Sequence, residues 1–233
     1  MPKRNEILKE RFEQIKKDLK QATLVAVSKF KPIDDLVAAY ECGQRDFGEN
    51  RIQELKEKAD YFEKIGIKDI RWHFIGHLQT NKINTLFKIP NLFYIHSVDS
   101  LKLLKELYKK KGLLEGRVIH FLLEIKTSGE EEKEGIESIE ELHEVINLVL
   151  AEKNSALVFS GFMTMGKIRT DDLLKEAKIC FKKLKDQKEK IEIQYHFSNL
   201  KLSMGMSHDW KIAIDEGADF VRVGSLIFSD QDI

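Results

Sequence analysis

The feature of this sequence that most constrains its fold is a regular alternation of short apolar runs with longer stretches of helical periodicity. Each of eight short runs is followed by a helical stripe or by a loop that opens a helix. Such alternation favours a parallel sheet, because a parallel strand reaches its neighbour only through a crossover connection. Eight units favour a closed barrel over an open doubly wound sheet, although periodicity alone does not decide closure. The strands are expected at 24–27, 45–48, 71–75, 92–95, 118–125, 156–162, 191–197 and 219–223.

The length and the charge balance narrow the class of protein. One β/α barrel fits the 233 residues, so we expect a single (β/α)8 TIM-type barrel domain over residues 1–233. Basic and acidic residues balance at 39 each, so neither nucleic acid nor a membrane is an expected partner. No apolar run reaches the ~20 residues that span a bilayer. The charged stretch 1–19 lacks the apolar segment of a signal peptide, so a cytoplasmic protein is expected.

Residues with reactive or hydrogen-bonding side chains cluster at the carboxyl ends of the expected strands. In a β/α barrel this face carries the active site. Lys29 directly follows the first strand. Walls of low dielectric lower the pKa of an amine in such a place, and a neutral amine attacks an aldehyde. A plain solvated lysine is the commoner alternative, and Lys31 is expected to be one. Asn50 and His77 follow the second and third strands and are expected as polar walls around a ligand.

Two loops that contain glycine and serine follow the last two strands. Phosphate commonly binds β/α barrels near strands seven and eight, where glycine lets backbone N–H groups approach an anion. The sequence therefore predicts a phosphate cup, with a simple helix cap as the alternative. The residues of the two loops are Ser203, Met204 and Gly205, and Gly224 and Ser225.

Arginine and histidine side chains complete the expected barrel mouth. Arg222, in the last strand, is expected either to donate to a ring nitrogen or to form a plain salt bridge. His73 and His77 flank Gly76, but no Asp or Glu stands at a ligand-like spacing, so no metal site is expected. His73 is instead expected to form a polar pair on its strand.

Six segments together closely resemble the pyridoxal-phosphate homeostasis proteins, a family related to the barrel domain of bacterial alanine racemase. They occur in family order and span nearly the whole chain. Two residues depart from the usual pattern, with Phe30 in place of threonine and Phe162 in place of leucine. Both changes are expected to alter the pocket wall and to leave the anchoring residues intact. The matching segments are 24–32, 47–54, 72–82, 161–165, 202–207 and 221–228.

The resemblance implies a barrel like the alanine racemase N-terminal domain that holds pyridoxal 5′-phosphate (PLP) as an aldimine on Lys29. It also implies that Arg222 lies beside the pyridine nitrogen. An arginine there does not keep that nitrogen protonated, so the cofactor is a weaker electron sink. The phosphate is expected on Ser203, Gly205, Gly224 and Ser225. The full set of expected cofactor-binding residues is Lys29, Asn50, His77, Ser203, Met204, Gly205, Arg222, Gly224 and Ser225.

Three functions remain open at this stage. The leading hypothesis is a monomeric carrier that takes part in PLP homeostasis, releases PLP to PLP-dependent apoenzymes, and has little or no catalytic turnover. The second is a PLP-dependent amino-acid racemase, which needs a second acid/base group besides the lysine. Only Tyr94 and Tyr195 lie near strand ends, and neither stands in a matching motif. The third is a barrel enzyme in which Lys29 attacks the carbonyl of a phosphorylated metabolite.

Overall fold

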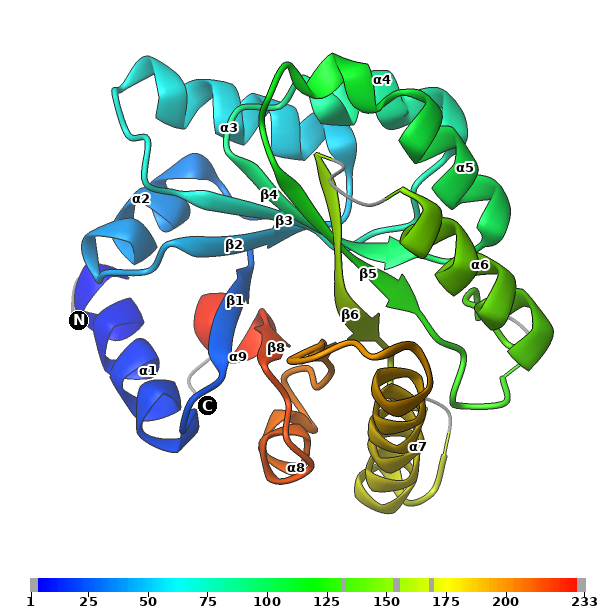
Figure 1. Cartoon of the computed structure of the whole chain (residues 1–233). Helices are drawn as coiled ribbons and strands as arrows, with labels where there is room; N and C mark the ends of the chain where they lie inside the picture. Colours follow the sequence, from blue (N-terminus) through cyan, green and yellow to red (C-terminus); the bar gives the residue numbers. More distant parts are fainter. Residues whose placement is uncertain (1–3, 131–132, 153–155, 168–169, 230–233) are drawn as a thin grey trace.

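Eight parallel strands form a closed barrel in the order β1-β2-β3-β4-β5-β6-β7-β8 (Figure 1). The computed structural model describes residues 4–130, 133–152, 156–167 and 170–229. Pairing of β1 with β8 closes the barrel, so the predicted TIM-type fold is confirmed. The strands are β1 (Thr23–Val27), β2 (Asp46–Glu49), β3 (Arg71–Phe74), β4 (Leu92–Val98), β5 (Ile119–Glu124), β6 (Leu157–Met163), β7 (Lys201–Ser203) and β8 (Phe220–Val223).

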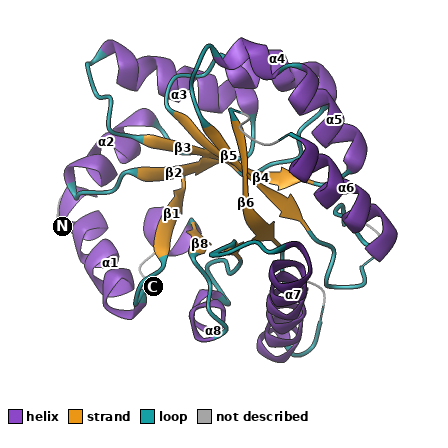
Figure 2. Cartoon of the chain, viewed as in Figure 1, coloured by secondary structure: helices purple, strands orange, loops and turns teal. Residues whose placement is uncertain are grey.

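Helices surround the strands as an outer ring (Figure 2). Their starts follow the capping residues of the sequence: Ser100 Oγ accepts the Leu103 N–H at 3.3 Å, and Asp172 Oδ1 accepts the Lys175 N–H at 3.1 Å. None of the described helices has the length and apolar character that crossing a bilayer requires. They are α1 (Arg4–Asp18), α2 (Ile33–Glu41), α3 (Ile52–Lys64), α4 (Ile83–Phe87), α5 (Leu101–Lys109), α6 (Ile139–Ala151), α7 (Leu173–Tyr195), α8 (Trp210–Asp215) and α9 (Ser225–Phe228), with the 3₁₀ helices η1 (Thr80–Lys82) and η2 (Lys111–Leu114).

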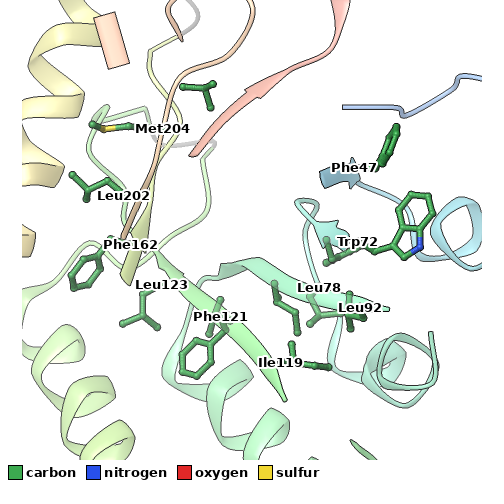
Figure 3. Close-up of a cluster of buried hydrophobic side chains, with 14 of the residues drawn as sticks. Phe47, Trp72, Leu78, Leu92, Ile119, Phe121, Leu123, Phe162, Leu202 and Met204 are labelled. Carbon is green, nitrogen blue, oxygen red and sulfur yellow. The ribbon is translucent and has the colours of Figure 1, made fainter. Parts of the chain in front are cut away.

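Strand side chains divide between two cores, because successive residues of a strand point to opposite faces. On β1, Leu24 and Ala26 join the outer core between strands and helices, whereas Val25 joins the inner core. The inner core contains only five buried apolar side chains among the described residues, so the barrel interior also takes polar groups. The outer core is large, and Figure 3 labels ten of its residues: Phe47, Trp72, Leu78, Leu92, Ile119, Phe121, Leu123, Phe162, Leu202 and Met204.

The strand predicted at 191–197 is wrong. Helix α7 continues to Tyr195, and the seventh strand is Lys201–Ser203. The alternation of Ile191 and Ile193 with polar residues imitates a strand, but in the helix Ile191 is buried and Ile193 is 77% exposed. An ion pair between Lys188 and Glu192, four residues apart, supports the last turns of α7.

Candidate functional site

A cavity of about 620 Å³ opens at the carboxyl ends of the strands, the face predicted from the sequence. Three of the predicted site residues do not line it, because they are buried behind its wall. These three are Ser203, Met204 and Gly205, and the same loop continues with Met206, Ser207 and His208, which do line the cavity. The six predicted residues that line it are Lys29, Asn50, His77, Arg222, Gly224 and Ser225.

Lys29 stands exposed at the rim, where the sequence predicted an amine enclosed by apolar walls. Helix α3 holds the backbone on both sides of it. Lys58 Nζ donates to the carbonyl oxygen of Ser28 at 2.8 Å, and the Phe30 N–H donates to Glu54 Oε2 at 3.0 Å. Phe30 has a φ of 62°, a left-handed conformation that costs about 1–2 kcal/mol for a residue with a Cβ. The contact with Glu54 therefore stabilises a strained turn directly after Lys29.

The contact between Lys58 and Ser28 belongs to a buried ion pair. Lys58 Nζ lies 2.6 Å from Glu49 Oε1, and Ser28 Oγ donates to the same oxygen at 2.6 Å. Glu49 is fully buried and Lys58 is 5% exposed. Burial raises the pKa of Glu49, and the charge of Lys58 opposes that rise. Such a pair fixes its geometry tightly, because removing either partner leaves a buried charge uncompensated.

A chain of hydrogen bonds, here called the relay, crosses the barrel interior from the cavity toward the amino-terminal ends of the strands. Arg222 Nη1 donates to Ser203 Oγ at 2.6 Å. Ser203 Oγ lies 2.8 Å from His96 Nδ1, and His96 Nε2 lies 2.8 Å from His73 Nδ1. His73 Nε2 lies 3.0 Å from Asp46 Oδ1. All five side chains are buried, and the polar pairing predicted for His73 is confirmed.

The direction of each hydrogen bond in the relay follows from the charges. Burial acts to raise the pKa of Asp46, but hydrogen bonds from Arg71 and His73 hold it below its ordinary value, so the carboxylate is ionised. Burial lowers the pKa of His73 and brings that of His96 well below 6.5, so both rings are neutral. A neutral imidazole has one donor and one acceptor nitrogen. His73 therefore donates to Asp46, His96 donates to His73, and the Ser203 hydroxyl donates to His96.

Arg222 is a fixed cation in the cavity wall. It is 4% exposed, and its Nη2 donates to the carbonyl oxygen of Thr164 at 3.0 Å. Burial lowers its pKa to about 10, and the charges of Glu124 and Asp209 oppose that fall. The guanidinium thus stays positive at neutral pH and has no freedom to swing away from Ser203 without leaving a buried donor unsatisfied.

Glycine shapes the two loops after β7 and β8. Gly205 has a φ of +90°, and a Cβ there would lie 2.5 Å from a side chain of α8. A Cβ on Gly224 would lie 3.0 Å from the carbonyl oxygen of Val27, so a glycine lets this loop approach the end of β1. The Gly224 N–H donates to Ser207 Oγ at 3.3 Å, which ties the two loops together. Ser207, Gly224 and Ser225 consequently form one side of the cavity.

His77 and Asn50 give the cavity polar walls, as predicted. The ground for expecting no metal site, that His77 lacks a carboxylate partner, is wrong. Asp99 Oδ2 lies 3.1 Å from His77 Nδ1, and Glu134 pairs with the same nitrogen. The side chains of His77 and Glu134 are about half exposed, so His77, Asp99 and Glu134 form a polar cluster at the rim. Asn50 Oδ1 is buried and has no hydrogen-bond partner among the described residues, which suits a polar ligand.

The structure adds cavity residues that the sequence did not single out, among them Glu124, Lys133 and Glu134, and removes two candidates. Glu124, the last residue of β5, lines the cavity. Tyr94 packs in the inner core, and the Tyr195 hydroxyl lies 2.6 Å from His143 Nδ1 on the outside of the barrel. Neither tyrosine is among the residues that line the cavity, so neither supplies a second acid/base group there.

Comparison with known proteins gives the same fold and a consistent set of relatives. Residues 5–232 match the family model described as "Alanine racemase, N-terminal domain". The human pyridoxal phosphate homeostasis protein is 39% identical over 218 residues, which cover 91% of this chain and 78% of that protein. The pyridoxal phosphate homeostasis protein of Aquifex aeolicus is 35% identical over 210 residues, covering 90% and 87%.

Two solved structures illustrate the range of similarity. PipY of Synechococcus elongatus, solved with PLP bound, superposes with a TM-score of 0.83 at 30% identity and covers 95% of this chain and all of its own. Alanine racemase of Corynebacterium glutamicum superposes with a TM-score of 0.71 at 14% identity, covering 98% of this chain and 62% of the racemase. At 14% identity, the comparison with the racemase shows only that the two proteins share the barrel fold.

Proposed function

Because the chain belongs to the family of pyridoxal phosphate homeostasis proteins and has the barrel of the alanine racemase N-terminal domain, we propose that it binds PLP and takes part in PLP homeostasis. The observation that carries this proposal is the placement of Lys29 and Arg222 in one cavity, with the loops after β7 and β8 beside them. That cavity pairs an accessible amine with a fixed cation and two loops that contain glycine and serine.

Lys29 is the residue that binds the aldehyde of the cofactor, as a Schiff base. Its amine makes no hydrogen bond or ion pair with the described residues, and its exposure gives an aldehyde access from solvent. Helix α3 fixes the backbone at Ser28 and Phe30, so only the side chain of Lys29 has to be ordered when the cofactor binds. A fixed backbone lowers the entropy lost on binding.

The remaining cavity residues fit the other parts of the cofactor. The Ser225 N–H and the hydroxyl groups of Ser207 and Ser225 would donate to the phosphate, and Gly224 lets the backbone approach it closely. Arg222 donates to the pyridine nitrogen, and as a guanidinium it has no proton to give up near neutral pH. Asn50 contributes the unpartnered oxygen at the wall. When bound, the cofactor supplies an aldehyde and an electron-accepting ring, but beside Arg222 that ring accepts electrons weakly.

The role that follows is storage and release with little or no turnover. The relatives carry names that describe homeostasis and no reaction. Neither Tyr94 nor Tyr195, the two tyrosines considered as a second acid/base group for a racemase, lines the cavity. The protein would act in the cytoplasm as a monomer and pass PLP to PLP-dependent apoenzymes.

Borohydride reduction of the PLP-treated protein, followed by peptide mass mapping, tests the proposal. We expect one pyridoxyl adduct, on Lys29, and none in the Lys29→Ala variant. Lys31→Ala is the matched control, because Lys31 lies two residues away and does not line the cavity. Adducts spread over surface lysines, or equal labelling of the Lys29→Ala variant, would reject PLP binding at this site.

A further inference from the structure

Glu124 is a buried carboxyl group in the cavity without a structural partner. It is 6% exposed and lines the cavity, yet its side-chain oxygens make no hydrogen bond or ion pair with the described residues. Glu49, the comparable buried glutamate of β2, engages Lys58 and Ser28 through Oε1, while its Oε2 is buried without a partner. Glu124 differs because it lines the cavity, and an ionised carboxyl group that is nearly buried gains from a cationic partner.

Glu124 and Lys29 lie on opposite sides of the barrel mouth. In a closed barrel of eight strands in sequence order, β5 stands four strands from β1 in either direction (Figure 1). Glu124 ends β5, and Lys29 follows the end of β1 by two residues. The carboxyl group therefore faces the lysine across the cavity, away from the glycine-containing loops that suit an anion.

The surroundings of Glu124 bring its pKa close to neutral pH. Burial raises its pKa to about 7, and the positive charge of Arg222 on β8 is the main opposing influence. Asp99 after β4 and Glu134 after β5 raise it further, while Lys133 on the same loop lowers it. A carboxyl group with this pKa accepts a proton near neutral pH and gives it back, as a general acid/base must.

We propose that Glu124 forms a second binding site in this cavity, for the ammonium group of a small primary amine that displaces Lys29 from PLP. This inference rests on the proposed function, and it gives that function a chemical route for release. The ligand class follows from the site: a lone carboxyl accepts an ammonium ion, and the cavity volume of about 620 Å³ leaves room beside a cofactor.

The exchange balances without an oxidant or a reductant. The ammonium group binds to the Glu124 carboxylate and gives it one proton, which frees the nitrogen lone pair for attack. The amine nitrogen would then add to the cofactor carbon that is double-bonded to the Lys29 nitrogen, and one proton would pass from the incoming nitrogen to the Lys29 nitrogen. The bond from that carbon to the Lys29 nitrogen would break as the carbon–nitrogen double bond re-forms to the amine. The proton held by Glu124 would end on the released Lys29 amine, so one carbon–nitrogen double bond replaces another and every proton is accounted for.

Release of PLP from the loaded protein by ethylamine tests the proposal. Protein carrying PLP on Lys29 is freed of excess cofactor, mixed with ethylamine between pH 6 and 8.5, and filtered to measure the released cofactor. For Glu124→Gln we expect amine-driven release about 100-fold slower, measured relative to the same variant's release in buffer alone, from the usual contribution of a general base. The matched control is Glu137→Gln, which removes a carboxylate from the loop after β5, outside the cavity, where Glu137 pairs with Lys126.

The pH dependence gives a second readout. The fraction of free ethylamine rises with pH equally for every variant, so the ratio of wild-type to Glu124→Gln release isolates Glu124. That ratio is expected to rise as pH passes through about 7, because the ionised carboxylate is the active form. Equal amine-driven release from both proteins, or an equal loss in Glu137→Gln, overturns the proposal. Failure of Glu124→Gln to hold PLP on Lys29 overturns it as well, since Glu124 would then belong to cofactor binding.

A measurement on the cofactor-free protein separates this proposal from the proposed function. Carboxyl ¹³C NMR of Glu124 reports its pKa, which ethylammonium is expected to lower by stabilising the ionised form. An unchanged pKa at saturating ethylammonium counts against the site. A lowered pKa in a protein that forms no adduct on Lys29 would keep the ammonium site and reject PLP binding.

Discussion

Replacing His96 with leucine is expected to weaken cofactor binding, although Ser203 stands between His96 and Arg222. His96 is fully buried and holds the centre of the relay. Leucine has a similar volume and no polar atom, so both hydrogen bonds disappear while the ring space stays filled. Ser203 then loses the acceptor that orients its hydroxyl, and Arg222 loses a fixed partner at the cavity wall.

The expected loss of stability follows from the two buried groups left without partners, the Ser203 hydroxyl and His73 Nδ1. Each unsatisfied buried group costs about 1–3 kcal/mol, so the free energy of unfolding should fall by about 2–6 kcal/mol. For a chain of this size that corresponds to a loss of roughly 5–20 °C in Tm. The looser Arg222 should raise the dissociation constant for PLP about tenfold, equivalent to ~1.4 kcal/mol.

Thermal unfolding and equilibrium titration with PLP measure the two effects. His120→Leu is the matched control, because His120 Nδ1 lies 2.8 Å from Ser160 Oγ in a half-buried pair outside the relay. The control should lose only ~0.5–1.5 kcal/mol of stability and keep wild-type affinity for PLP. If His96→Leu binds PLP like wild type and loses no more stability than His120→Leu, the relay does not position Arg222.

Three further predictions concern groups behind the cavity. Lys58→Met should lower the free energy of unfolding by about 3–5 kcal/mol, because Glu49 is left as an unpaired buried charge, and in urea denaturation the added change Glu49→Gln should restore part of the loss. Gly205→Ala should cost roughly 2–5 kcal/mol by denaturant unfolding, from its φ of +90° and the crowding against α8. Burial lowers the pKa of His73 and His96 below 6.5. Below pH 6.5 the unfolded chain therefore binds protons that the folded chain does not. Each histidine should then reduce the free energy of unfolding by ~1.4 kcal/mol per pH unit until the pKa of that histidine in the folded chain is reached. Urea titrations at pH 7.5, 6.5 and 5.5 check this, and equal slopes for wild type and His96→Leu would contradict it.

Local periodicity was enough to predict the barrel but not every strand. The alternation of apolar runs with helical stripes gave eight βα units, and the structure has eight strands in sequence order. The error at 191–197 arose because Ile191 and Ile193 alternate over a stretch too short to separate a strand from the end of a helix. The actual strand, Lys201–Ser203, has three residues and lacks any periodic signal.

Site residues that directly follow a strand could be predicted from the sequence. Contacts between segments far apart in the sequence could not. Lys29 and Arg222 were identified from their place at the carboxyl ends of β1 and β8. Ser203 was assigned to the cavity for the same reason, but its hydroxyl turns inward to His96, 107 residues away in sequence. Glu124 was missed because a glutamate that ends an apolar strand resembles any solvated strand terminus, and only the closed barrel places it opposite Lys29.

Rigid support and an exposed amine together suit a protein that both holds and releases an aldehyde. Lys29 and Arg222 are each fixed from behind by groups that do not line the cavity: Lys58 and Glu49 on one side, and the histidines of the relay on the other. This support lowers the entropic cost of binding, while the open rim would give water and amines access to the Schiff base proposed for Lys29. A catalyst that protects a reactive intermediate excludes water from its site. This mouth leaves Lys29 exposed to solvent, which is the access that the proposed exchange of the cofactor requires.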